Sequence, residues 1–225
     1  MSSALRTFES NKTDVTDLLA AHTKLGGRNR GRRPSEMQIL NKAAIIFCAA
    51  IWEAFVEELV EEAVKHLATH VTNKDNLTPY LRQQIETQCQ KLINNDAGRL
   101  WDVASKSIGD LIRDNAKRVA NTVPSTGKEF NTAKTKQVSA LIHGCLGLST
   151  VEVNWTWQGL DCDRAKAKLD KYIEIRGDLA HGKRSISSVP KTTASQMLTH
   201  FSLLAAKTDE AIQAHLLAIT GVNLP

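Results

Sequence analysis

The sequence is poor in the residues that shape turns and sheets: it has 12 Gly, 5 Pro, 2 Tyr and 5 Phe among 225 residues. A protein of β-strands joined by tight turns needs more Gly, Pro and aromatic residues than this. The abundant Ala, Leu, Lys and Glu favour helices instead. The hydrophobic fraction of 42% is enough to form a core, which excludes extensive disorder.

Signals for secretion and for membrane insertion are also missing. The four cysteines are scattered and form no CxxC pair; they are Cys48, Cys89, Cys145 and Cys162. Residues 1–25 are polar and amphipathic, unlike a signal peptide. The most apolar stretch, residues 43–52, is too short to cross a bilayer. We therefore expect a soluble cytoplasmic protein with reduced thiols.

Several motifs of catalysis and ligand binding are absent as well. Gly144 and Gly147 lack the Lys-Ser/Thr that follows the glycines of a phosphate-binding loop, and no GxSxG sequence occurs. His143 and Cys145 have no second ligand pair at the spacing of a zinc site. We expect no metal and no cofactor. The net charge of +5, from 29 basic and 24 acidic residues, permits a polyanionic partner such as RNA.

Apolar residues recur at helical spacing through most of the chain. This predicts an all-α fold, a bundle of long antiparallel helices with short additional helices, at residues 5–25, 35–70, 79–92, 97–119, 132–145, 161–182 and 193–219. The first helix and a basic loop (1–34) pack on or lead into a main domain at 35–220. Residues 151–159 are expected to be a connector with an extended segment. Its Trp155 and Trp157 either pin it to the core or stack on bases.

The second predicted helix carries two rows of residues at helical spacing. Six apolar residues predict its buried face: Ile45, Cys48, Trp52, Val56, Leu59 and Ala63. Glu53, Glu57 and Glu61 follow one another at steps of four on another side, and we interpret this acidic row as a solvated face.

The loop GGRNRGRRP, at 26–34, is basic and contains no acidic residue. Its arginines, Arg28, Arg30, Arg32 and Arg33, suit RNA phosphates without sequence preference. The alternative is a solvated loop with no ligand.

The sixth predicted helix contains a charged residue where an apolar one is expected. At about 100° per residue, Arg176 falls in one sector with five apolar residues, namely Leu169, Tyr172, Ile173, Leu179 and Ala180. Either Arg176 pairs with a buried acid, or it faces a cleft and binds an anionic substrate. His181 follows five positions later. Gly182 predicts that the helix ends at His181, so the two side chains can converge. Such a pair suits phosphate chemistry.

The string RGDLAHG, from Arg176 to Gly182, resembles the RxxxxH motif of the HEPN superfamily. IWEAFVEELV, at 51–60, resembles the Trp-Glu helix of its stand-alone prokaryotic branch, found in toxin and phage-defence settings. The resemblance spans about 35–220. It implies a metal-independent endoribonuclease, a homodimer acting as a toxin or defence effector, with an antitoxin or defence-system protein as partner.

In that family, the RNA 2′-hydroxyl attacks the adjacent phosphate and leaves a 2′,3′-cyclic phosphate. The resemblance assigns acid–base chemistry to His181 and charge stabilisation to Arg176. The family often has a polar residue directly after the arginine, where this chain has Gly177, and Asp178 is the candidate to replace it. The alternatives are a non-catalytic HEPN module that binds RNA or protein, and a helical scaffold with no nucleic-acid role.

Overall fold

The computed structural model describes residues 1–25, 35–125, 127–182 and 189–225. These residues contain no β-strand, which confirms the predicted all-α fold. The α-helices are α1 (Ser3–Leu25), α2 (Ser35–His70), α3 (Pro79–Asn95), α4 (Arg99–Ala104), α5 (Ile108–Asn121), α6 (Thr135–Leu146), α7 (Cys162–Ala180) and α8 (Lys191–Thr220). Two short 3-10 helices are η1 (Lys74–Asn76) and η2 (Val151–Asn154).

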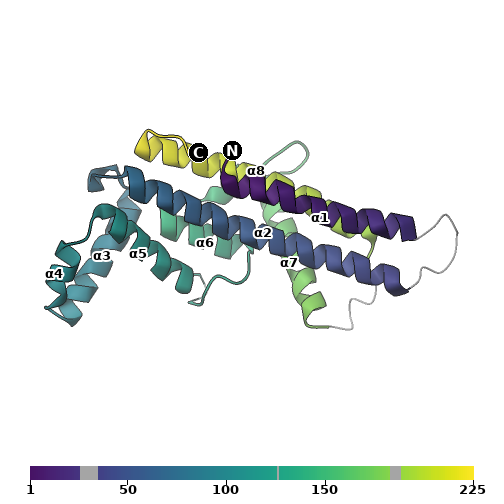
Figure 1. Cartoon of the computed structure of the whole chain (residues 1–225), viewed down its shortest axis with the longest axis horizontal. Helices are drawn as coiled ribbons and strands as arrows, with labels where there is room; N and C mark the ends of the chain where they lie inside the picture. The colour runs from purple at the N-terminus through teal and green to yellow at the C-terminus, as the bar shows by residue number, and fades with distance from the viewer. Residues whose placement is uncertain (26–34, 126, 183–188) are drawn as a thin grey trace.

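Helix α2 is the central element of the bundle. Helices α1 and α8 pack along it, and α5, α6 and α7 contact it as well (Figure 1). Helices α3 and α4 pair with each other at one end of the molecule. The two chain termini lie close together, and the backbone N–H of Ser2 donates to the buried carboxylate of Asp209 on α8. No helix in the described part of the chain has the length and apolarity to cross a membrane.

The predicted apolar face of α2 forms the middle of the core. All six residues of this face are at most 1% exposed: Ile45, Cys48, Trp52, Val56, Leu59 and Ala63. The ring of Trp52 packs against Trp155 and Phe201, and its indole N–H donates to the carbonyl of Ala133 at 2.9 Å. Trp52 therefore joins α2 to α8 and to two loops, and it fixes the position of its neighbour Glu53.

The single helix predicted at 97–119 is two helices in the structure. Helix α5 begins with a capping box, in which the Ser107 hydroxyl accepts from the N–H of Asp110 and the Asp110 carboxylate accepts from the N–H of Ser107. The break turns α4 away from the core, so Trp101 is 78% exposed. The apolar periodicity continued across the break and concealed it.

The connector after α6 also differs from the prediction. The expected extended segment is instead a 3-10 helix, η2, followed by an isolated bridge between Trp157 and Leu160. Trp155 is fully buried, and its indole N–H donates to the hydroxyl of Thr208 on α8 at 2.9 Å. Trp155 thus pins the connector to the core.

Candidate functional site

Helix α7 begins and ends with specific local contacts. The Asp161 carboxylate caps its start and accepts from the N–H of Arg164 at 2.9 Å. At the other end, the N–H of His181 donates to the Gly177 carbonyl at 3.0 Å. Gly182 has a φ of +62°, which favours glycine and stops the helix. The helix ends at Ala180, one residue before the predicted end, and His181 is its C-cap.

Arg176 lies where the buried stripe of α7 reaches the surface. Tyr172 and Ile173, the residues one turn earlier, are buried, and the Tyr172 ring packs against Phe201 of α8. The Arg176 side chain is 31% exposed. Its Nη2 donates to Oε2 of Glu53 on α2 at 3.1 Å, and the Glu53 side chain is 20% exposed. The acid partner of Arg176 therefore comes from within the same chain.

This contact corrects the interpretation of the acidic row of α2. Glu57 and Glu61 are exposed, as a solvated face requires, but Glu53 is not. Helix α7 packs against α2 at Glu53, so this carboxylate loses most of its water. The acidic partner of Arg176 is therefore Glu53, a member of the row that we interpreted from the sequence as a solvated face.

The charges around Glu53 act in opposite directions. Burial raises the pKa of the Glu53 carboxyl above its ordinary value, the Arg176 guanidinium lowers this pKa, and the Glu57 carboxylate raises it. Burial is the largest of the three effects, so Arg176 compensates only part of the cost of placing the carboxylate there. Glu53 and Arg176 therefore form an ion pair in which both side chains remain partly hydrated.

The other motif residues surround the end of α7. His181 is exposed, and Asp178 is half-buried. A Cβ at Gly177 would meet nothing within 4 Å, so the position has room for a side chain. The C-terminal end of α7 projects beyond the body of the bundle (Figure 1). The structure therefore places Arg176, Asp178 and His181 at one projecting helix end.

The other candidate sites are the basic loop, clusters of possible metal ligands and the cysteines. The four arginines predicted to bind RNA lie outside the described residues; they are Arg28, Arg30, Arg32 and Arg33. In the described part of the chain, no group of three or more His, Cys, Asp or Glu could hold a metal ion. Burial raises the pKa of the Cys48 and Cys145 thiols to about 12, so neither is a ready nucleophile.

The RiboL-PSP-HEPN family model matches residues 8–214. The chain belongs to this family. No curated protein and no solved structure matches it. The RiboL-PSP-HEPN match contains all of α2 and α7, including Glu53, Arg176 and His181, and it begins inside α1.

In this RiboL-PSP-HEPN chain, sequence reasoning did not select Glu53 as a site residue. Glu53 and Arg176 are 123 positions apart, and no local pattern relates them. The available signal was its place next to Trp52, a large apolar residue that had to be buried. Where a carboxylate beside such an anchor is itself only partly exposed, as Glu53 is, it favours a charged partner.

Proposed function

We propose that this RiboL-PSP-HEPN protein is a metal-independent endoribonuclease. The observation that carries the proposal is a half-exposed arginine held by a carboxylate of another helix, five residues before an exposed histidine at the helix end. A fixed guanidinium recognises phosphate through paired N–H donors, and an imidazole can transfer a proton near neutral pH. The two groups together suit cleavage of a phosphodiester.

In the proposed reaction, the RNA 2′-oxygen forms a bond to its own adjacent phosphorus, and the bond from phosphorus to the 5′-oxygen breaks. His181 removes the proton from the 2′-hydroxyl or supplies one to the leaving 5′-oxygen. Arg176 stabilises the extra negative charge of the five-coordinate phosphorus. The products are a 2′,3′-cyclic phosphate and a 5′-hydroxyl, and no redox step or metal is required. Asp178 is assigned a supporting polar role at the same helix end.

Glu53 acts in this scheme as a positioning residue. The guanidinium has five N–H donors, and Glu53 is contacted through Nη2. The remaining donors can bind phosphate oxygens while Glu53 keeps the arginine oriented. Because Glu53 is only partly hydrated, its contact restricts Arg176 before RNA arrives.

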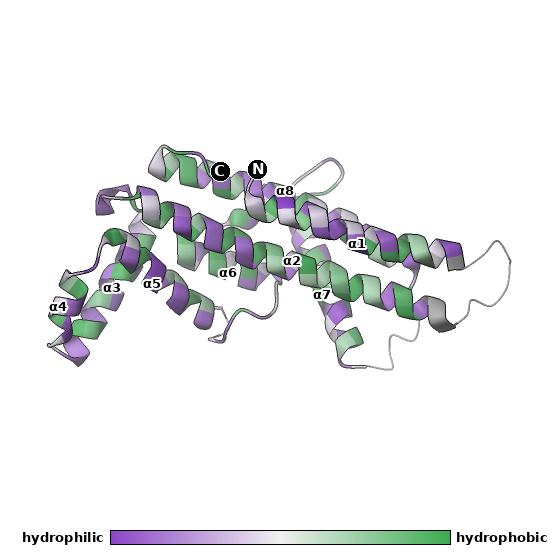
Figure 2. Ribbon diagram, in the orientation of Figure 1, coloured by the Kyte–Doolittle hydropathy of each residue, from purple (hydrophilic) through white to green (hydrophobic). Residues whose placement is uncertain are grey.

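An exposed apolar strip on α2 supports a homodimer. Ile39, Ile46 and Phe47 are 65%, 40% and 49% exposed, and the N-terminal half of α2 is largely apolar (Figure 2). Ile46 precedes Glu53 by seven residues, about two turns, so both lie on the same side of α2. A second copy that covers this strip would bring its own α7 close to the first. Two copies of Arg176 and His181 would then share one cleft.

A toxin or phage-defence role, with an antitoxin or defence-system protein as partner, is the biological setting we propose. One observation favours a second function, a non-catalytic module that binds RNA or protein. Arg176 is already engaged by Glu53, and Gly177 supplies no polar side chain beside it. In this alternative the ion pair stabilises the fold, and RNA binds without being cut.

RNA cleavage by the purified protein in the presence of EDTA tests the proposal. Wild type should cut and leave cyclic phosphate ends, and His181→Ala should not cut. His70→Ala, which removes an exposed histidine from the far end of α2, is the matched control and should retain activity. Cleavage that requires added Mg²⁺ or Mn²⁺ contradicts the mechanism. Binding of RNA without cleavage by wild type favours the non-catalytic module.

A further inference from the structure

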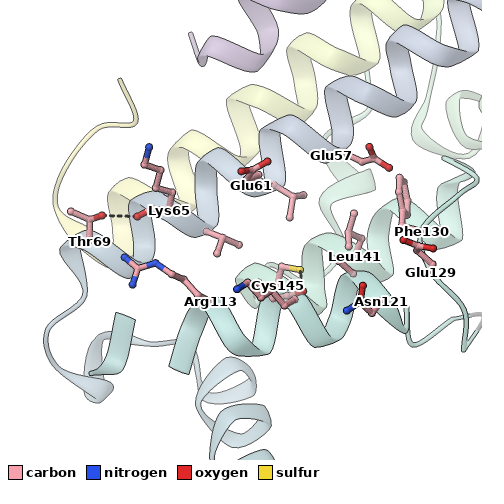
Figure 3. Close-up of a pocket in the computed structure, with 15 residues that line it drawn as sticks. Glu57, Glu61, Lys65, Thr69, Arg113, Asn121, Glu129, Phe130, Leu141 and Cys145 are labelled. Carbon is pink, nitrogen blue, oxygen red and sulfur yellow. Dashed lines mark hydrogen bonds between the residues drawn. The ribbon is translucent and has the colours of Figure 1, made fainter. Parts of the chain in front are cut away.

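A groove separate from the α7 site lies between α2, α5 and α6 (Figure 3). Its volume is about 780 Å³. Apart from the charged and polar residues of its rim, the residues that line it are apolar or carry a thiol: Val60, Val64, Ala116, Ala120, Phe130, Leu141 and Cys145. Neither Arg176 nor His181 lines it. The groove is therefore a second surface with its own chemistry.

Two helices form its walls. Helices α2 and α5 touch where Gly109 meets the Ala68 carbonyl, since a Cβ at Gly109 would lie 2.3 Å from that oxygen. Beyond this contact the groove opens along α5. Polar residues line each wall at steps of four, namely Glu57, Glu61, Lys65 and Thr69 on α2, and Arg113, Lys117 and Asn121 on α5. An apolar floor between two polar walls is the shape that receives an amphipathic helix.

The length of the groove fits such a helix. Twelve helical steps separate Glu57 from Thr69, which is about 18 Å at the rise of an α-helix. A docked helix of about 12 residues would cover this length with three turns.

Most of the wall charges have no ion-pair partner among the residues that the structure describes. No ion pair of the described residues includes Glu57, Glu61, Lys65 or Lys117. Arg113 pairs with Asp110 of its own helix, but both side chains are about half exposed. Burial and the neighbouring carboxylates of Glu129 and Glu58 raise the pKa of Glu57. The α2 wall thus has uncompensated negative charge at the Glu57 end, and the α5 wall is positive.

We infer that this groove binds an amphipathic helix of a partner protein, whose apolar stripe contacts the floor, with Lys or Arg toward Glu57 and Glu61 and with Asp or Glu toward Arg113 and Lys117. Figure 3 shows Glu57 and Glu129 at one end of the groove and Lys65 and Arg113 at the other. The charge pattern selects the orientation and flank composition of the bound helix.

A displayed peptide library provides the test. Its members are helices of about 14 residues with a fixed leucine stripe and random residues on both flanks. They are selected on the immobilised full-length protein and counter-selected on Ala120→Trp, which fills the groove. Ala214→Trp adds the same side chain to an exposed position of α8 and is the matched control. Thermal unfolding establishes that both variants fold.

Supporting results are peptides with a basic flank and an acidic flank, at least about tenfold weaker binding to Ala120→Trp, and normal binding to Ala214→Trp. A Glu57→Lys/Glu61→Lys variant should bind these peptides more weakly and should prefer versions with an acidic residue on that flank. No enrichment, or enrichment without a charge bias, overturns the inference. So does a wild-type dimer that Ala120→Trp dissociates, because the occupant would then be a second copy. Saturable binding of small apolar compounds with no peptide selected indicates a small-molecule pocket and also overturns it.

Discussion

Replacing Arg176 by Gln separates the two roles that a charged residue of α7 can have. Breaking a fully buried ion pair costs about 3–5 kcal/mol, whereas an exposed pair contributes roughly 0–1 kcal/mol. The Arg176 and Glu53 side chains are 31% and 20% exposed, so each partner can turn to water when the other is lost. We therefore expect Arg176→Gln to lower the free energy of unfolding by about 1 kcal/mol.

The effect on cleavage should be much larger. Removing one preorganised donor from a developing negative charge reduces the chemical step by about 10²–10³-fold. Glu53→Gln should affect cleavage less, because Arg176 keeps its charge but loses its orientation. Burial raises the pKa of Glu53 despite Arg176, so its carboxylate is unfavourable in the fold and Glu53→Gln should cost little stability.

Urea unfolding and single-turnover cleavage, at one fixed protein concentration, measure both effects. The double variant completes a cycle that gives the coupling between the two residues. Lys134→Gln is the matched control, since Lys134 pairs with Glu174 of α7 at 2.9 Å and this pair is also partly exposed. It should leave cleavage unchanged.

Two results would refute this reasoning. A loss of 3 kcal/mol or more in Arg176→Gln, on the scale of a broken buried pair, would make Arg176 a structural residue. Undiminished cleavage by a folded Arg176→Gln protein would remove Arg176 from the chemistry.

Three further predictions concern other parts of the chain. The basic loop contains Arg28, Arg30, Arg32 and Arg33. Replacing these four arginines with Gln should weaken RNA binding and flatten its salt dependence without changing the melting temperature. Filter binding measures the first two effects and thermal unfolding the third. Gly109→Ala should destabilise the fold by about 1–3 kcal/mol, because its Cβ would meet the Ala68 carbonyl. Gly177→Ala should stabilise α7 by about 0.5–1 kcal/mol, because its Cβ would meet nothing and alanine favours a helix. Urea unfolding measures both changes. Burial lowers the pKa of His200 to about 4 from its ordinary 6.5, so the folded state binds fewer protons than the unfolded chain between these values. Stability should fall by up to roughly 3 kcal/mol as pH decreases from about 6.5 to about 4, and His200→Gln should flatten this slope in urea titrations.

The features that could be predicted from sequence are those with a local physical cause. The buried face of α2 follows from apolar residues at three-and-four spacing, and every residue assigned to it is buried. The end of α7 follows from Gly182, because the left-handed backbone there favours glycine. Arg176 was selected because a charged residue does not suit the apolar stripe of a helix, and His181 because it follows Arg176 at the end of the same helix.

The features that could not be predicted depend on contacts between distant segments. At the break before α5, the apolar periodicity favours one continuous helix, whereas the Ser107–Asp110 capping box favours a new helix start. The structure has the new helix start. The sequence contains both signals and does not rank them. The partner of Arg176 required knowing which side of α2 meets α7, and this depends on the packing of residues that are 123 positions apart in the chain.

Helix α2 contributes residues to the core, to the α7 site and to the groove. The distances between these residues along the helix limit how strongly the three regions interact. Glu53 and Glu57 are one turn apart, about 6 Å between their Cβ atoms. At that separation two unit charges interact by roughly 0.7 kcal/mol in water-like surroundings, about half a pKa unit. The repulsion by Glu57 raises the pKa of Glu53, and a basic residue docked beside Glu57 would relieve it. That gain would strengthen the contact between Glu53 and Arg176 only slightly. A partner helix in the groove would therefore not control the α7 site through this charge alone.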